Sequence, residues 1–149
     1  VYNMNEEKSR MTLNISAQNR ELIYQLVAKK TLGFNSLSTK EIFKYASALG
    51  LNKPSNLKNS DTYVRVDYLH TSDKALLITT KLGKAKTIAQ IDEYCNIEHS
   101  YVEAEKCANT GFKILKEKVD AANGDEELLA NRLLIELETL YQTNVKSTL

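Results

Sequence analysis

The chain has two cysteines and two histidines, the side chains that could bind a metal ion or act as a nucleophile and its base. Cys95 and His99 are four residues apart, so a continuous helix would place both side chains on one face, as two metal ligands require. Glu103 and Cys107 follow on the same predicted helix and would complete a zinc set. However, the chain has no C-x-x-C pair, and the helix can break between Cys95 and His99. The sequence therefore favours a buried cysteine and a surface histidine, with no bound metal.

Nucleophilic catalysis would have to use Cys107 with His70 or His99 as its base. Cys107 lies in a stripe of small residues, where a structural thiol is expected instead. The chain contains no G-x-x-x-x-G-K-[ST], G-x-G-x-x-G or G-x-S-x-G motif, so no phosphate-binding loop or nucleophile elbow is indicated. The acidic residues between positions 92 and 105 fit a solvated helix face. We expect no enzymatic activity, no catalytic residues and no cofactor.

A nucleic-acid interface is the remaining chemistry that the residue types allow. Residues 12–50 run in the order short strand, helix, turn, helix, which resembles a ribbon-helix-helix unit, in which paired strands of a dimer enter the major groove. The alternative is a helical hairpin with a solvated basic face. In the DNA-binding interpretation, two strand residues face the bases, a helix start binds phosphate and the basic side chains supply salt-sensitive affinity. The candidate residues are Arg10, Thr12, Asn14, Arg20, Lys29, Lys30, Ser38, Thr39, Lys40 and Lys44.

Apolar periodicity and capping residues predict the elements that would position these side chains. The clearest helix begins with Ser38-Thr39-Lys40-Glu41, a capping box, and ends at Gly50, which is expected to form a left-handed turn. Strand-like alternation occurs at 12–15 and at 63–68, and the second segment has no partner that the sequence identifies. Ser16 and Asp125 are expected to cap the first and last helices, and Asn123-Gly124 is expected to close the long helix before the last one. The inward stripe of that long helix is predicted to be Tyr101, Ala104, Ala108, Phe112, Leu115 and Val119. The last helix is predicted to be amphipathic, with Leu129, Leu133, Leu137, Leu140 and Tyr141 as its apolar residues. The helices are expected over about 17–30, 38–50, 73–82, 86–94, 98–122 and 125–142.

The fold predicted from these elements is all-α in the main. It is a compact bundle of about five to six helices with one or two short strand-like segments near 12–15 and 62–68. At 149 residues the chain is expected to be a single domain, with residues 1–11 as a loose leader and 143–149 as a frayed tail. Its five glycines and single proline disfavour a sandwich or barrel, which needs many turns.

Charge is unevenly distributed along the chain. Residues 1–60 hold nine Lys or Arg against four acids, whereas residues 91–149 hold six against twelve. The basic part could meet nucleic acid, or the two ends could pair with a complementary partner or a second copy. The sequence contains no run of about 18 apolar residues, the length of a membrane span. With only two cysteines, a reducing cytoplasm is the expected location.

Two segments resemble a known family. The run Ser38–Gly50 (STKEIFKYASALG) is similar to a capped helix in dnd-system-associated proteins, small proteins linked to DNA phosphorothioation islands and prokaryotic defence genes. The run Glu105–Leu115 (EKCANTGFKIL) is similar to a second motif of that family, although Cys107 replaces a tyrosine and Thr110 a glycine. Ala75-Leu76-Leu77 resembles the family's middle helix. The resemblance covers about residues 16–120 and implies an accessory role in DNA modification or antiviral defence.

Two functional hypotheses follow. The first is a non-enzymatic accessory or adaptor protein that acts through protein–protein contacts in such a system, with homodimer formation through the apolar last helix as a further possibility. The second is a DNA-binding regulator that uses residues 10–50.

Overall fold

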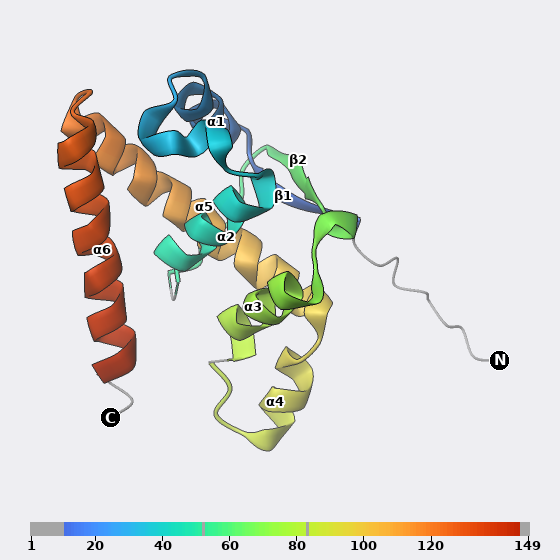
Figure 1. Cartoon of the computed structure of the whole chain (residues 1–149). Helices are drawn as coiled ribbons and strands as arrows, with labels where there is room; N and C mark the ends of the chain where they lie inside the picture. Colours follow the sequence, from blue (N-terminus) through green and yellow to red (C-terminus); the bar gives the residue numbers. More distant parts are fainter. Residues whose placement is uncertain (1–10, 52, 83, 147–149) are drawn as a thin grey trace.

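The chain folds around one long helix. The computed structural model describes residues 11–51, 53–82 and 84–146. Within these residues, six α-helices, two short 3-10 segments (η) and two strands follow one another (Figure 1), which confirms the mainly helical prediction. In chain order the elements are β1 Thr12–Ser16, α1 Ala17–Ala28, η1 Thr31–Ser36, α2 Thr39–Leu49, β2 Ser60–Arg65, η2 Val66–Tyr68, α3 Thr71–Leu82, α4 Ile88–Tyr94, α5 Ile97–Ala122 and α6 Glu126–Lys146.

The two strands pair with each other in an antiparallel sheet. Leu13 is opposite Val64 and Ile15 is opposite Asp61, with an irregularity in the register between Leu13 and Asn14. Leu13, Ile15 and Val64 are almost completely buried, so one face of this small sheet lies on the core. The partner that the sequence left unidentified for the second strand is therefore β1. That strand also ends earlier than predicted, because Val66–Tyr68 turns into η2.

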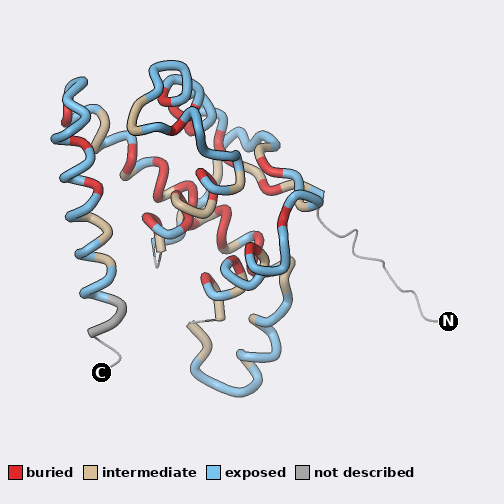
Figure 2. The backbone as a smooth tube through the Cα atoms, viewed as in Figure 1, coloured by how far each residue is buried: buried red, intermediate tan, exposed pale blue. Residues whose placement is uncertain are grey.

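Helix α5 provides most of the surface on which the other elements pack. Of the side chains predicted to face inward, Tyr101, Ala104, Ala108, Phe112 and Leu115 are buried and Val119 is half-buried. Figure 2 shows buried positions recurring along α5 and on the elements that cross it. Helices α2 and α3 lie against it, as do β1 and the first half of α6. Because these contacts are apolar, burial of this surface is the main stabilising term for the fold.

The crossing of α2 and α5 depends on two glycines. A Cβ atom on Gly50 would lie 1.8 Å from the Cys107 carbonyl oxygen, and one on Gly111 would lie 1.8 Å from the Ala46 carbonyl oxygen. Each helix thus brings its glycine against the backbone of the other. The predicted left-handed turn at Gly50 is wrong, since its φ is −94°. The glycine is needed there for close approach and not for its backbone conformation.

Several helix ends follow the predicted capping residues, although α3 begins at Thr71, two residues before its predicted start. Glu41 N–H donates to Ser38 Oγ at 3.3 Å and Ser38 N–H donates to the Glu41 carboxylate at 2.8 Å, which confirms the capping box. Helix α5 closes at Asn123 and Gly124, both with positive φ. Ser16 occupies the N-cap position of α1, but its hydroxyl makes no capping hydrogen bond. That hydroxyl is used elsewhere, in contacts with α5 and the 53–59 loop.

Helix α6 extends further along the chain than predicted. Asp125 caps it, because Leu128 N–H donates to its carboxylate at 3.0 Å. The helix continues to Lys146, so residues 143–146 are not part of a frayed tail. Of the apolar residues predicted for this helix, Leu129 and Leu133 are buried, whereas Tyr141 is 61% exposed. Residues 1–10 of the predicted leader, residues 147–149 of the tail and Gly83 lie outside the described residues. Met11, predicted as the end of the leader, joins the fold through its carbonyl, which accepts from Val66 N–H at 2.9 Å.

Within the described residues, none of the helices combines the length and the apolar character that crossing a membrane requires.

Candidate functional site

The strand residues predicted to read DNA bases are engaged within the protein. Thr12 Oγ1 donates to Asn14 Oδ1 at 3.1 Å, and Asn14 N–H donates to the Glu105 carboxylate of α5 at 2.5 Å. Strand β1 pairs with β2 of the same chain, whereas a ribbon-helix-helix dimer pairs it with a second copy. Arg10 lies outside the described residues.

Arg20 and the start of α2 also have partners in the fold. The Arg20 guanidinium contacts Asp61 at 2.7 Å, in a pair that is about half exposed, and donates to the Thr62 carbonyl. At Ser38 the backbone N–H is already bound by the Glu41 carboxylate, which is a negative charge placed where a phosphate was predicted. Thr39 is the first residue of α2 and is exposed.

Lys40 and Lys44 hold a buried carboxylate. Asp73, near the start of α3, is only 3% exposed and contacts Lys44 Nζ at 2.6 Å and Lys40 Nζ at 2.9 Å. His70 N–H also donates to it at 2.8 Å. The hydrogen bonds from Lys44 and Lys40 and from the His70 backbone together hold the pKa of Asp73 well below its usual range. We refer to Asp73, Lys40 and Lys44 as the Asp73 cluster, and its geometry assigns these lysines to joining α2 and α3.

Lys29 and Lys30 are the predicted basic residues that stay exposed without an ion pair inside the described part of the chain. They follow the end of α1. Lys29 lines a groove together with Asp125 and Glu126 at the start of α6. The basic and acidic ends of the sequence are therefore neighbours in space. The nine described candidates lie on four segments of the fold, and several of their charges are neutralised locally.

The cysteines and histidines are not brought together as ligands. Cys95 is exposed, whereas Cys107 is completely buried among the inward-facing side chains of α5. The helix is interrupted between Cys95 and His99, because α4 ends at Tyr94 and α5 begins at Ile97. Asn96 caps α5, since its side-chain oxygen accepts from Glu98 N–H at 2.9 Å. Across residues 11–51, 53–82 and 84–146, no group of three His, Cys, Asp or Glu side chains could hold a metal ion.

A buried polar group that the sequence did not single out centres on Asn109 of α5. Its Oδ1 accepts from Ser16 Oγ at 2.8 Å and from Asn19 Nδ2 at 2.9 Å. Its Nδ2 donates to Ser55 Oγ at 2.8 Å and to the Asn56 carbonyl at 3.2 Å. We call Ser16, Asn19, Ser55 and Asn109 the Asn109 cluster. The sequence signal was the asparagine itself, a polar residue on the inward stripe of α5.

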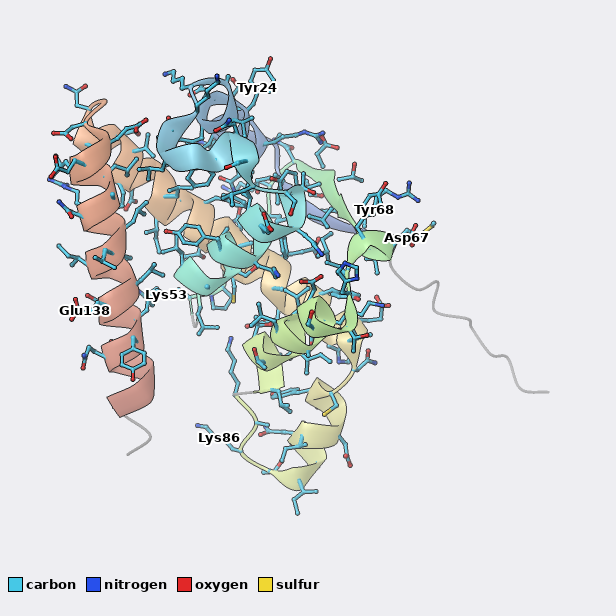
Figure 3. All side chains as sticks on the ribbon, viewed as in Figure 1. Tyr24, Lys53, Asp67, Tyr68, Lys86 and Glu138 are labelled. Atoms are coloured by element: carbon cyan, nitrogen blue, oxygen red, sulfur yellow. The ribbon has the colours of Figure 1, made fainter. Side chains whose placement is uncertain are left out.

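Four exposed apolar side chains lie on the last helix, α6. Leu134, Ile135 and Tyr141 are between 61% and 64% exposed, and Leu128 is 37% exposed. Spacings of seven residues place Leu128 in one row with Ile135 and Leu134 in a second, adjacent row with Tyr141. We call these four residues the α6 outer face. Helix α6 forms one edge of the molecule (Figure 1), and Glu138 points away from the other elements (Figure 3).

No protein-family model, curated protein or solved structure matches this chain.

Proposed function

We propose that the protein is a non-enzymatic accessory or adaptor protein that acts through protein–protein contacts in the cytoplasm. The observation that supports this most is the α6 outer face, because four large apolar side chains stay in water on a helix whose other side is buried. Clusters of exposed apolar residues on a folded domain are typical of protein-binding surfaces. The system that it serves, prokaryotic DNA modification or antiviral defence, is proposed from the resemblance of residues 38–50 and 105–115 alone.

The chemistry of the face indicates the kind of partner. Glu138 lies three residues after Ile135 and four after Leu134, so its carboxylate borders the apolar side chains. Glu127 borders Leu128 at the other end of the face and is exposed. A partner that covers this surface would therefore offer an apolar groove with lysine or arginine on its rim.

The test compares three proteins purified from the native host after chemical cross-linking. These are the unchanged chain, the double variant Leu134→Glu/Ile135→Glu, and the control Tyr24→Glu. Tyr24 is 71% exposed on α1 (Figure 3), so it matches the exposure of the two α6 residues but lies on another element. All three proteins should remain folded, because exposed side chains contribute little to the core.

We expect a DNA-processing or defence protein to be recovered with the unchanged chain and with the control, and to be lost with the double variant. Cross-links should join the partner to α6. Recovery that is equal for all three proteins, or recovery of no such component, would count against the proposal. If the species lost is a second copy of the chain, sedimentation velocity will show a dimer that only the double variant disrupts, and the surface is then a self-association face instead.

DNA binding is the second candidate. Lys29 and Lys30 are the observation in its favour, since both are exposed and neither makes an ion pair within the described residues.

A further inference from the structure

A polar cavity of about 260 Å³ opens where the start of α1, the 53–59 loop and the middle of α5 meet. The Asn109 cluster supplies part of its lining, through Ser16, Asn19 and Asn109. Lys58 from the loop and Lys113 from α5 also line it, and both side chains belong to exposed residues. The cavity is smaller than the usual range for drug-sized ligands, which begins at about 300 Å³, so it suits a small group.

The lining is positive and hydrophilic. It contains two lysines and no Asp or Glu, although the chain has 19 acidic residues. Neither the Lys58 nor the Lys113 ammonium group makes an ion pair within the part of the chain that the structure describes. No aromatic side chain lines the cavity, so there is no surface on which a nucleobase could stack. These features together favour a small anion.

One buried side chain in this cavity has unused hydrogen-bonding capacity. Asn19 is only 5% exposed and makes one side-chain hydrogen bond within the described residues, from Nδ2 to Asn109 Oδ1. Its amide oxygen therefore accepts no hydrogen bond from that part of the chain. The oxygen is not among the enclosed, unsatisfied side-chain atoms of the described residues, so it is open to water in the cavity. A ligand that brings a donor would replace that water with a direct hydrogen bond.

The ligand must then combine negative charge with a hydroxyl donor. A phosphate monoester has both in one group, because near neutral pH part of the population keeps one P–OH while the other oxygens are anionic. Its anionic oxygens can accept hydrogen bonds from the Lys58 and Lys113 ammonium groups, while its P–OH donates to the amide oxygen of Asn19. Sulfate and the internal phosphodiesters of DNA carry charge but no such proton.

The N-terminus of α1 adds to the attraction without defining the site. The Ser16 hydroxyl is drawn into the Asn109 cluster and accepts from Lys58 N–H at 3.2 Å, so it does not cap the helix. Gln18, in the first turn, lines the cavity. The Ala17 N–H donates to the Asn59 carbonyl at 3.1 Å, so the attraction for negative charge comes from the other amides of the first turn.

We propose that this cavity binds a small phosphate monoester, recognised through Lys58, Lys113 and the Asn19 amide. The site is separate from the α6 outer face, so the proposal stands or falls independently of the adaptor role. Its ligand is recognised by the phosphate group alone.

The experiment titrates the isotope-labelled full chain with inorganic phosphate and follows the amide signals by NMR, with sodium chloride at matched ionic strength as the reference. We expect shifts concentrated at Gln18, Asn19 and Asn59. Sulfate should bind about fivefold more weakly, because it lacks the proton that one hydrogen bond requires. A short DNA duplex without terminal phosphates is the third probe.

Three variants complete the test. Lys58→Gln/Lys113→Gln should weaken phosphate binding about tenfold or more, since it removes both charge-assisted contacts. Gln18→Glu should weaken it too while leaving the fold intact, because an acid in the first turn stabilises a helix. Lys29→Gln/Lys30→Gln removes the same charge elsewhere and should change nothing.

Each other outcome overturns the proposal. Shifts spread over the whole surface, or an equal loss in the Lys29/Lys30 control, mean general screening of charge. Equal binding of sulfate and phosphate removes the role of Asn19. Binding of the duplex at the same residues without binding of inorganic phosphate identifies a nucleic-acid backbone site and rejects the monoester.

Discussion

Replacing Asp73 tests whether the Asp73 cluster holds the fold together. The carboxylate is 3% exposed and accepts two lysine hydrogen bonds at 2.6 and 2.9 Å and one backbone N–H at 2.8 Å. Breaking a buried ion pair by removing one partner typically costs about 3–5 kcal/mol. Here the two lysine side chains are 22% and 26% exposed, so they can turn toward water and recover part of that cost. We expect Asp73→Asn to lower the free energy of unfolding by about 2–3 kcal/mol.

Acidic pH should reduce the difference in unfolding free energy between the original protein and Asp73→Asn. The pKa of Asp73 is lower in the folded chain than in the unfolded chain, so its contribution is fully present above the unfolded pKa of about 4. As pH falls below that value, the unfolded chain binds the proton first, and the stabilisation is lost through the folded pKa. The gap between the original protein and Asp73→Asn should therefore be constant from about pH 5 to 7 and narrow below about pH 4.

Urea unfolding followed by far-UV circular dichroism measures both effects. The control is Asp67→Asn, which removes a carboxylate from the pair with Arg65, where both side chains are 60% exposed. That change should cost less than about 0.5 kcal/mol. Equal midpoints for the two variants, or a gap that does not change with pH, would refute the reasoning. Because Lys40 and Lys44 belong to this cluster, neutralising them to test DNA binding would also weaken the fold.

Three further changes test other parts of the structure. Gly111→Ala should lower the free energy of unfolding in urea by more than about 3 kcal/mol, because its Cβ would lie 1.8 Å from the backbone of α2. Gly124→Ala should lower it by only about 1 kcal/mol, because no atom lies within 4 Å and only its φ of +84° is unfavourable. Similar values for the two would contradict the close helix crossing. Ser38→Ala should lower stability by about 1 kcal/mol through loss of the capping box, measured the same way, and an unchanged midpoint would mean that water replaces the cap. The double variant Lys29→Gln/Lys30→Gln should lower any affinity of the first two helices for duplex DNA without changing stability. Fluorescence anisotropy between about 50 and 200 mM salt measures that affinity. Retained affinity would exclude these two lysines as DNA contacts.

Local signals in the sequence predicted local structure well. The capping box at Ser38, the Asn123-Gly124 closure and the inward stripe of α5 depend on residues within one or two turns of each other, and all three are present. The order and approximate ends of the helices follow from the same kind of signal.

Such local signals do not identify which segments pack against each other in the folded chain. The pairing of β1 with β2 joins segments about 50 residues apart, and alternation predicts a strand without naming its neighbour. Gly50 was correctly placed at a helix end but for the wrong reason, because the backbone that it touches comes from α5. Tyr141 belongs to the predicted apolar set of the last helix together with Leu129 and Leu133, but periodicity does not say how far along a helix the core extends, and Tyr141 is exposed.

The candidate site was the least predictable part. Lysine positions are visible in a sequence, but whether a lysine is free depends on a partner such as Asp73, which lies 33 and 29 residues beyond Lys40 and Lys44. The α6 outer face was foreseen only as a surplus of apolar residues. The Asn109 cluster was missed, because an asparagine on an inward stripe signals a buried polar group but does not say which other segments it bonds.

The Asn109 cluster also has a consequence for synthesis of the chain. Ser16 and Asn19 bond a residue 93 and 90 positions later, and β1 lies on a core surface supplied largely by α5. A chain made from its N-terminus must therefore release its first strand and helix well before the residues that bury them exist. Closing so long a loop is slow relative to helix formation. The surfaces of the first fifty residues that pack on α5 can therefore be covered only after α5 has left the ribosome.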